Sequence, residues 1–332
     1  MHRYLMEMLQ CPACRGRLSW TINDADGERI ESAKATCAAC GAAYPVREGI
    51  GLFLTAGLER EDLWEETETE LTRYLREHPH IEARLMGADP DALSPADLFY
   101  RAQLLESRGD YGEAARLAER ALSRCYTPGY LACHKSLMRA LIERLRAAQD
   151  PIVDLASGRG GLVEAVVREL PRPVVATDFS PRILRRDQRW LRYFGLYDRV
   201  SLLAFDARQT PFRDGAVQTL TTNLGLPNIR HPGELLTELR RIVAGSFLAI
   251  TQFYPEEDEA NGCLIREAGV ACFLYRRTAL EAFAAAGWQV EVAESQHAPA
   301  APTPRGELLE GAGIDALPVV ETSLEWCLLI AR

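Results

Sequence analysis

Four cysteines near the start of the sequence form two CxxC pairs, Cys11/Cys14 and Cys37/Cys40. A CxxC turn presents two thiolates to one tetrahedral Zn²⁺, and two such turns complete a structural site. A glycine follows each pair closely and allows the backbone to turn tightly beside the sulfurs. Four free thiols and a redox pair are the alternatives, but a redox CxxC requires neither a second pair nor the glycines. The spacing therefore predicts a structural zinc site.

A second group of residues follows predicted strands in the second half of the chain. The strand-like run 152–157 leads into Gly158 and Gly160, and two later apolar runs end on Asp178 and Asp206. The glycines let the backbone approach a bound nucleoside without Cβ clashes. Asp178 follows Gly158 by 20 residues, a position from which a carboxylate accepts two ribose hydroxyls. This pattern predicts a nucleoside-binding site.

A dinucleotide site is the first alternative for these residues. It requires a third small residue after the glycine pair, where this chain has Leu162, and it places a pyrophosphate at the helix N-terminus. Acids at 154 and 206 repel a pyrophosphate and suit a cationic cofactor that carries an amino-acid tail and an adenine amino group. The charges therefore favour the cationic cofactor.

Strands and helices alternate from residue 151 onward, which predicts a doubly wound, mostly parallel α/β sheet. The expected strands cover residues 152–157, 174–177, 200–205, 216–222 and 247–253, with a terminal strand at 326–330. A helix is expected over 162–170, before Pro171. Such sheets bind ligands at the carboxyl ends of their strands. The glycines and acids singled out above all lie at those ends.

Three segments of this region resemble class I S-adenosylmethionine-dependent methyltransferases: 154–160 (DLASGRG), 176–181 (ATDFSP) and 205–215 (FDARQTPFRDG). By that resemblance, Asp178 holds the ribose hydroxyls, Asp206 holds the adenine amino group, and the 156–160 loop holds the methionine part. Asp154 would orient this loop. Ala156 replaces the usual first glycine, and Gln218 stands where an aspartate is common. The cofactor-binding residues implied are Asp154, Ala156, Ser157, Gly158, Gly160, Asp178, Phe179, Asp206, Ala207 and Asn223.

The N-terminal module resembles the zinc ribbons related to the small activator subunit of tRNA and protein methyltransferases. The resemblance covers residues 5–54 and includes the segment 40–50 (CGAAYPVREGI), with Gly51 where proline is usual. A strand over 18–22 and a turn over 23–27 predict a hairpin between the cysteine pairs. We expect the metal to supply folding free energy, because about 50 residues bury too little core to fold unaided.

The methyl acceptor is less well defined by the sequence. Asn223, His231 and Tyr254 follow the fourth and fifth strands and are weak candidates for acceptor contact or for a base. Five arginines between Arg182 and Arg192, interleaved with aromatic residues, are of a type that grips RNA. The zinc module ahead of a methyltransferase domain also resembles the architecture of bacterial rRNA guanine methyltransferases. RNA therefore remains an alternative to a small-molecule or peptide acceptor.

The composition of the chain bears on the choice between RNA and a smaller methyl acceptor. The chain has 332 residues and a net charge of −9, with 47% hydrophobic residues, which is typical of a globular protein without a general affinity for nucleic acid. Arginine is the default cation, 36 against two lysines. The charge balance favours a small-molecule or peptide acceptor over RNA. A non-enzymatic module, in which the ribbon recruits a partner and the methyltransferase fold is vestigial, remains open.

The expected organisation has three parts: a zinc ribbon at 1–55, a helical bridge or cap at 56–149, and a class I methyltransferase domain at 150–332. Amphipathic runs at 96–105 and 114–122 predict helices in the middle part, and the acidic stretch Glu59–Glu70 predicts a solvated helix face. The sequence shows no membrane span and no secretory signal, so a cytoplasmic setting is expected.

Overall fold

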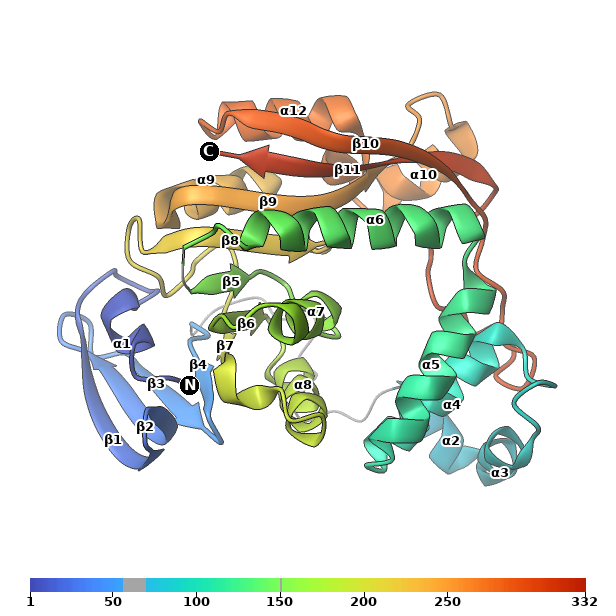
Figure 1. The fold of residues 1–332 in the computed structure, drawn as a ribbon, viewed down its shortest axis with the longest axis horizontal. Coiled ribbons are helices and arrows are strands. Elements are labelled where there is room, and N and C mark those ends of the chain that lie inside the picture. The colour runs from blue at the N-terminus through green and yellow to red at the C-terminus, as the bar shows by residue number, and fades with distance from the viewer. Residues whose placement is uncertain (56–69, 150) are drawn as a thin grey trace.

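The computed structural model describes residues 1–55, 70–149 and 151–332. Of the stretch expected to be a solvated helix face, residues 59–69 lie outside this description. The described strands form one sheet in the order β1-β2-β3-β4-β7-β6-β5-β8-β9-β11-β10. Ribbon and α/β domain therefore share a continuous sheet (Figure 1).

The N-terminal ribbon is an antiparallel sheet that continues into the parallel one. It consists of α1 (Leu5–Met8), β1 (Leu18–Asp26), β2 (Arg29–Cys37), β3 (Ala43–Arg47) and β4 (Ile50–Leu52). The predicted hairpin is confirmed, but its turn lies at Gly27, later than expected, because β1 stays paired with β2 as far as Asp26↔Arg29. Strand β4 then pairs in parallel with β7, Ile50 opposite Leu202. Nothing in the sequence pattern indicates this pairing.

The α/β part contains all five predicted parallel strands. They are β5 (Ile152–Asp154), β6 (Val174–Asp178), β7 (Val200–Ala204), β8 (Val217–Asn223) and β9 (Val243–Phe253). Two further strands close the far edge: β11 (Thr322–Ala331) pairs antiparallel with β9, and β10 (Val290–Ala300) pairs antiparallel with β11. The terminal strand expected at 326–330 is confirmed as part of β11. The mostly parallel α/β fold is thus established.

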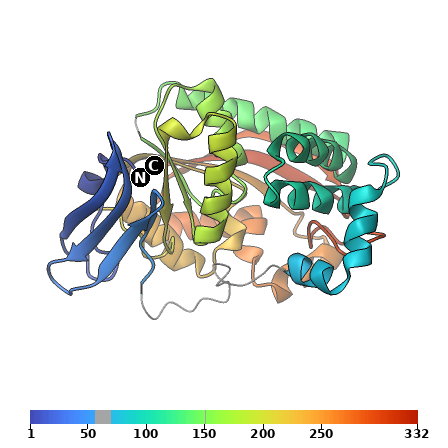
Figure 2. The ribbon, with the colours of Figure 1, turned by 90° about the horizontal axis from the view of Figure 1, so that it is seen from below.

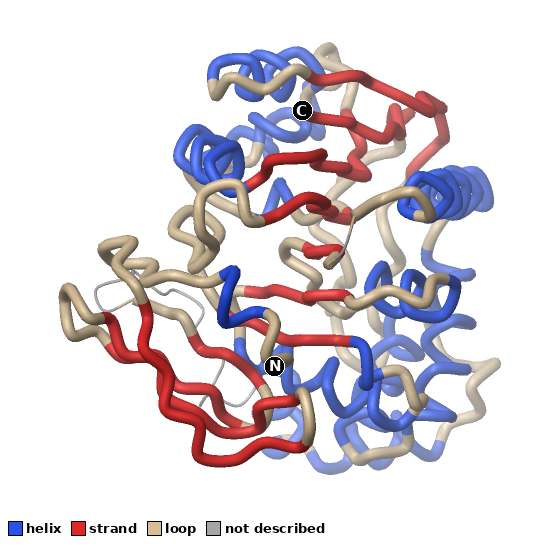
Figure 3. The backbone as a smooth tube through the Cα atoms, turned by 60° about the vertical axis from the view of Figure 1, so that its left-hand side comes forward, coloured by secondary structure: helices blue, strands red, loops and turns tan. Residues whose placement is uncertain are grey.

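Helices cover both faces of this sheet (Figure 3). They are α7 (Gly161–Glu169), α8 (Pro181–Tyr193), α9 (Pro232–Ile242), α10 (Glu259–Glu267), α11 (Ala271–Leu274) and α12 (Arg276–Ala285), with short 3₁₀ turns η1 (Tyr197–Arg199) and η2 (Leu226–Asn228). Apolar residues of α6, α7 and α8 form one core with the sheet, and those of α9 and α12 form the other. Each face is buried, which explains the near-continuous apolar runs of the strands.

The middle of the chain is helical, as expected. It contains α2 (Glu70–Glu77), α3 (Pro79–Gly87), α4 (Pro95–Ser107), α5 (Tyr111–Cys125) and α6 (Pro128–Leu145). Side chains of Ser94, Asp110 and Thr127 cap α4, α5 and α6 by accepting backbone N–H groups. Helices α2–α5 have a small core of their own and lie at the opposite end of the molecule from the ribbon (Figure 2). No described helix has the length and apolar character that crossing a membrane requires.

Candidate functional site

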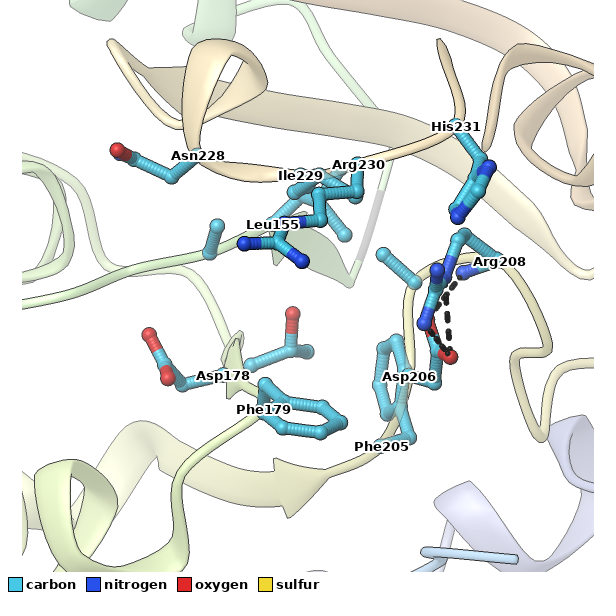
Figure 4. A pocket seen from close by; sticks show the side chains of 13 residues that line it. Leu155, Asp178, Phe179, Phe205, Asp206, Arg208, Asn228, Ile229, Arg230 and His231 are labelled. Carbon is cyan, nitrogen blue, oxygen red and sulfur yellow. Dashed lines mark hydrogen bonds and ion pairs between the residues drawn. The ribbon is translucent and has the colours of Figure 1, made fainter. Parts of the chain in front are cut away.

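A cavity of about 320 Å³ lies at the carboxyl ends of β5, β6 and β7 (Figure 4). These three strands are neighbours in the sheet, so their ends meet at one edge. The walls of the cavity combine acidic, basic and apolar side chains. The lining residues are Leu155, Ala156, Thr177, Asp178, Phe179, Phe205, Asp206, Ala207, Arg208, Asn228, Ile229, Arg230 and His231. The structure thus brings together five of the predicted cofactor residues at one cavity, Ala156, Asp178, Phe179, Asp206 and Ala207.

Asp178 connects the glycine loop to the cavity. Its Oδ2 accepts the backbone N–H of Gly158 at 3.1 Å, and its Oδ1 accepts that of Ser180 at 2.9 Å. These bonds fix the carboxylate where β6 ends, at the wall of the cavity. The rings of Phe179 and Phe205 lie beside it on the same side of the cavity (Figure 4). Such a wall, apolar beside a carboxylate, suits a nucleoside.

The loop after β5 has a tightly wound backbone. Ala156, Gly158 and Gly160 all have positive φ, at +51°, +52° and +71°. An alanine in this region costs about 1–2 kcal/mol relative to glycine, which gives a physical reason for glycine being usual at position 156. Gly160 begins α7 as its N-cap. Ser157 supports the loop, because its hydroxyl donates to the Asp154 carbonyl and accepts the Thr177 N–H.

Asp154 lies beneath this loop rather than in the cavity. Its carboxyl group is fully buried and accepts the Thr221 hydroxyl at 2.8 Å. Burial raises the pKa of Asp154 to about 7, and the nearby hydroxyls of Ser157 and Thr221 offset this in part. The residue is therefore placed to hold the loop against β8. It does not line the cavity, so it is not positioned to contact a ligand there.

Asp206 is already paired. The Arg208 guanidinium donates to both of its carboxylate oxygens, at 3.0 Å from Nε to Oδ1 and 2.8 Å from Nη2 to Oδ2 (Figure 4). The Arg208 backbone N–H also donates to Oδ1 at 2.9 Å, so an adenine amino group would have to share this carboxylate with Arg208. Arg208 and Arg230 also bring positive charge to the cavity wall. The electrostatic argument against a pyrophosphate is consequently weaker than the sequence alone suggested.

The structure places one of the three candidate catalytic residues at the cavity. His231 is exposed, lines the cavity and has a positive φ of 58°. Asn223 ends β8, and its Oδ1 accepts from Nε2 of His134 on α6 at 3.2 Å. Tyr254 is buried just beyond β9, with no described hydrogen-bond partner for its hydroxyl. Asn223 and Tyr254 are not among the residues that line the cavity.

The four predicted zinc ligands form one cluster. All four sulfurs of Cys11, Cys14, Cys37 and Cys40 lie within 4.8 Å of one another, with Cys11–Cys40 at 3.7 Å and Cys14–Cys37 at 3.4 Å. Sulfurs bound to one tetrahedral zinc at about 2.3 Å lie about 3.8 Å apart. A Cβ on Gly16 would stand 2.9 Å from the Cys37 sulfur, so this glycine is required for closure. The cluster therefore fits a structural zinc ion.

The first cysteine pair and the residues just before it, which we call the zinc knuckle (residues 8–15), also contact the segment that follows Asp206. The Gln10 N–H donates to the Pro211 carbonyl at 2.7 Å, and the Arg213 N–H donates to the Met8 carbonyl at 2.9 Å. A second cavity, of about 630 Å³, lies between the knuckle, the 206–210 segment and α9. The ribbon thus supports the loop that forms one wall of the first cavity.

Sequence reasoning missed several residues of the site. Arg208 has a detectable signal, since a cation two residues after a strand-end acid is well placed to pair with it. His134 has none, because it is a single histidine in an amphipathic helix 89 residues before its partner Asn223. Ile229 and Arg230 reach the cavity through the turn after β8, whose path depends on tertiary packing.

Comparison with known proteins identifies both parts of the chain. Residues 2–49 match the family model of Trm112p-like proteins, and residues 152–245 match that of a methyltransferase domain. A demethylmenaquinone methyltransferase of Thermus thermophilus is 35% identical over 130 residues, 39% of this chain and 58% of the relative. The corresponding protein of Lactiplantibacillus plantarum is 28% identical over 116 residues, 34% of this chain and 49% of the relative. The matches thus span about half of each relative's length.

Solved structures resemble the chain at low identity. The YcgJ protein of Bacillus subtilis aligns with a TM-score of 0.47 at 14% identity, covering 60% of this chain and 98% of that one. A geranyl diphosphate C-methyltransferase of Streptomyces coelicolor aligns with a TM-score of 0.44 at 20% identity, covering 59% and 75%.

The family matches agree with the four-cysteine cluster and the mostly parallel α/β fold. The chain therefore combines an N-terminal Trm112p-like zinc ribbon with a class I S-adenosylmethionine-dependent methyltransferase domain.

Proposed function

We propose that the protein transfers a methyl group from S-adenosylmethionine to a small molecule. The observation that carries the proposal is the carboxylate of Asp178, which is fixed by the Gly158 N–H at the wall of a cavity inside a methyltransferase domain. When bound, S-adenosylmethionine supplies an electrophilic methyl group on a sulfonium. The protein's own contribution is then mainly to hold and align the two reactants.

Different residues of the cavity bind different parts of S-adenosylmethionine. Asp178 accepts the ribose hydroxyls, and the apolar side chains of Phe205 and Ile229 provide surfaces for the adenine ring. Asp206 accepts the adenine amino group and shares its carboxylate with Arg208. The 156–160 loop offers backbone groups to the methionine part. These roles, together with the division of the chain at residues 55 and 149, are part of the proposal.

Two observations favour a small acceptor. The curated relatives named above are demethylmenaquinone methyltransferases, which act on a small molecule. In addition, two of the five arginines on α8 are engaged within the protein: Arg186 pairs with Glu106 and Asp187, and Arg192 lies 3.8 Å from Glu31. Arginines committed to carboxylates contribute little to phosphate binding. A peptide acceptor is the nearest variant of this proposal, and RNA is a weaker alternative.

The ribbon is proposed to act structurally, through zinc-dependent folding and its pairing with β7. A cytoplasmic setting belongs to the same proposal, since reduced thiolates are needed for the metal site. Partner docking through the ribbon remains an alternative role.

Calorimetric titration with S-adenosylhomocysteine tests the cofactor assignment. We expect the wild type to bind, and Asp178→Ala to lower the affinity about 10- to 100-fold, because hydrogen bonds to a charged group are worth about 1.5–3 kcal/mol. Asp24→Ala, an exposed aspartate of the ribbon hairpin, is the matched control and should bind as the wild type does. Tight NAD binding without S-adenosylhomocysteine binding would overturn the assignment.

Incubation with methyl-labelled S-adenosylmethionine and a size-fractionated bacterial lysate tests the acceptor. Label in the small-molecule fraction is the expected outcome. Label in precipitable material that ribonuclease removes would instead establish the RNA alternative. Cofactor binding without any labelled product would favour the non-enzymatic alternative.

A further inference from the structure

One face of the sheet carries polar side chains beneath α6, beside the cavity. Side chains alternate along a strand, so residues 250, 252 and 254 of the β9 end point to the same side. Asn223 pairs with Ile250 and Trp326 pairs with Gln252, which places all of them on this face. Ile250, Tyr254 and Trp326 share a core with apolar residues of α6, which crosses this face (Figure 1). We call Asn223, Gln252, Tyr254 and Trp326 the α6 face.

Three buried atoms of the α6 face have no hydrogen-bond partner among the described residues. They are the Tyr254 hydroxyl, the Trp326 indole N–H and the Gln252 Oε1. Trp326 is fully buried and Tyr254 is 4% exposed. Buried polar groups in native proteins are paired with protein, water or ligand, so three unpaired groups on one face require an explanation. Two of them, at Trp326 and Tyr254, donate hydrogen bonds.

The surroundings of these atoms are aromatic. The Tyr126 and Tyr130 rings stack with centroids 4.7 Å apart, and Tyr130 meets Trp326 edge-on at 4.8 Å. The His134 ring lies 5.7 Å from Trp326. Flat apolar surfaces next to polar atoms match a planar ring that carries oxygen.

His134 supplies a hydrogen-bond acceptor to the same place. Its Nε2 lies 3.2 Å from Asn223 Oδ1, and a carboxamide oxygen accepts without donating. Nε2 therefore carries the hydrogen, which leaves Nδ1 of a neutral ring as an acceptor. Burial lowers the pKa of His134, and the hydrogen bond to Asn223 offsets this only in part, so the neutral form is favoured.

The α6 face adjoins the cavity through the turn after β8. A Cβ built on Gly225 would lie 3.0 Å from the Ala156 Cβ and 3.3 Å from the Leu155 carbonyl. Both of those residues line the cavity. Asn223 precedes Gly225 by two residues, which corresponds to about 7 Å of extended chain. A molecule on the α6 face thus lies next to the loop proposed to hold the methionine part of the cofactor.

The charge near the α6 face selects against anions. The Tyr126 hydroxyl donates to Asp315 at 2.6 Å, and this carboxylate adds to burial in raising the pKa of both Tyr130 and Tyr254. A carboxylate so placed repels an anionic ligand, whereas a neutral hydroxyl or carbonyl meets no such cost.

We propose that the α6 face and His134 bind the methyl acceptor, and that this acceptor is an uncharged planar aromatic ring bearing a hydroxyl. Trp326 and Tyr254 donate to oxygen atoms of the ring, and His134 Nδ1 accepts from its hydroxyl. Asn223 is a positioning residue, because it acts by fixing the His134 ring. The proposal rests on the methyltransferase function proposed above and names its acceptor class.

Titration of 1-naphthol into protein saturated with S-adenosylhomocysteine tests the proposal, with 1-naphthoate as the anionic comparison. We expect 1-naphthol to bind more tightly than 1-naphthoate. Tyr254→Phe removes one donor and keeps the ring, and Trp326→Phe removes the indole N–H and leaves a smaller aromatic ring. Each should weaken 1-naphthol binding about three- to tenfold. Trp190→Phe is the matched control, because its indole N–H is already bonded to Glu164 of α7 at 2.7 Å. Its affinity should equal that of the wild type.

Equal affinity for 1-naphthol in all four proteins would overturn the site, and tighter binding of 1-naphthoate would overturn the acceptor class. Absence of 1-naphthol binding with S-adenosylhomocysteine bound would overturn both. Absence of S-adenosylhomocysteine binding to the wild type would refute the proposed function instead. Retained S-adenosylhomocysteine affinity in Trp326→Phe and Tyr254→Phe shows that these variants fold, so a loss of 1-naphthol binding is specific.

Discussion

The ribbon and the helical region flank the α/β domain but are attached to it in different ways. The ribbon joins through main-chain groups: β4 pairs with β7, and the Phe53 N–H donates to the Ala204 carbonyl at 2.8 Å. In the helical region, α6 packs into the apolar core of the sheet, whereas α2–α5 reach the α/β domain through polar side chains such as Asp97 and Glu106. Glu106 of α4 is buried and pairs with both Arg159, in the 156–160 loop, and Arg186 of α8.

This difference determines how each region acts on the candidate site. Main-chain pairing depends on an intact strand, so the ribbon supports the 206–213 segment only while its own fold, and hence its zinc, is present. A buried ion pair depends on particular side chains, because removal of one partner leaves the other charge without compensation. Loss of zinc should therefore disrupt all contacts between the ribbon and the α/β domain together. A single substitution should be enough to disrupt the contact that the helical region makes through Glu106.

Loss of zinc should give the largest effect. Cys11→Ser, or chelation, is expected to abolish zinc binding and unfold the ribbon, which withdraws the main-chain partners of Pro211 and Arg213. We expect the affinity for S-adenosylhomocysteine to fall at least about tenfold, or about 1.4 kcal/mol. Metal analysis and calorimetry measure this. Cys263→Ser changes an exposed cysteine outside the cluster and serves as the control. Unchanged affinity after zinc loss would show that the ribbon does not support the site.

Glu106→Gln should give the second largest effect. The substitution removes the carboxylate shared by Arg159 and Arg186, and we expect a loss of about 2–3 kcal/mol in the free energy of unfolding, less than for a fully buried pair because Arg159 is partly exposed. Urea denaturation measures it. Glu143→Gln breaks an exposed pair with Arg146 and should leave stability unchanged. Zinc content should stay the same in both variants. If Glu106→Gln released zinc, the two attachments would not be independent.

Gly51→Ala should give the smallest effect and tests the close approach of the ribbon to the sheet. A Cβ at this position would stand 2.7 Å from Leu203 Cδ2 and 2.9 Å from the Phe53 ring. We expect a loss of about 1–2 kcal/mol in the free energy of unfolding, the usual cost of overpacking a core. Gly87→Ala, which has nothing within 4 Å of the new Cβ, is the control and should not destabilise the protein. Equal stability of the two variants would mean that β4 shifts freely against β7.

Local patterns in the sequence determined much of this molecule. The CxxC spacing predicted the four-cysteine cluster, and alternating apolar runs with terminal acids predicted β5–β9 and the cavity at their carboxyl ends. Both rest on short-range chemistry: two thiolates three residues apart can share one ion, and parallel strands bring their carboxyl ends to a common edge.

Tertiary structure decided the rest. The pairing of β4 with β7 joins residues about 150 positions apart through main-chain groups, which nearly every residue type can supply. Asp206 could be identified as a strand-end acid, but its ion pair with Arg208 depends on how the following turn folds. His134 meets Asn223 because α6 crosses the sheet at a particular height, which amphipathic periodicity does not specify. Periodicity determines which side of an element is buried, and packing between elements determines which side chains meet there.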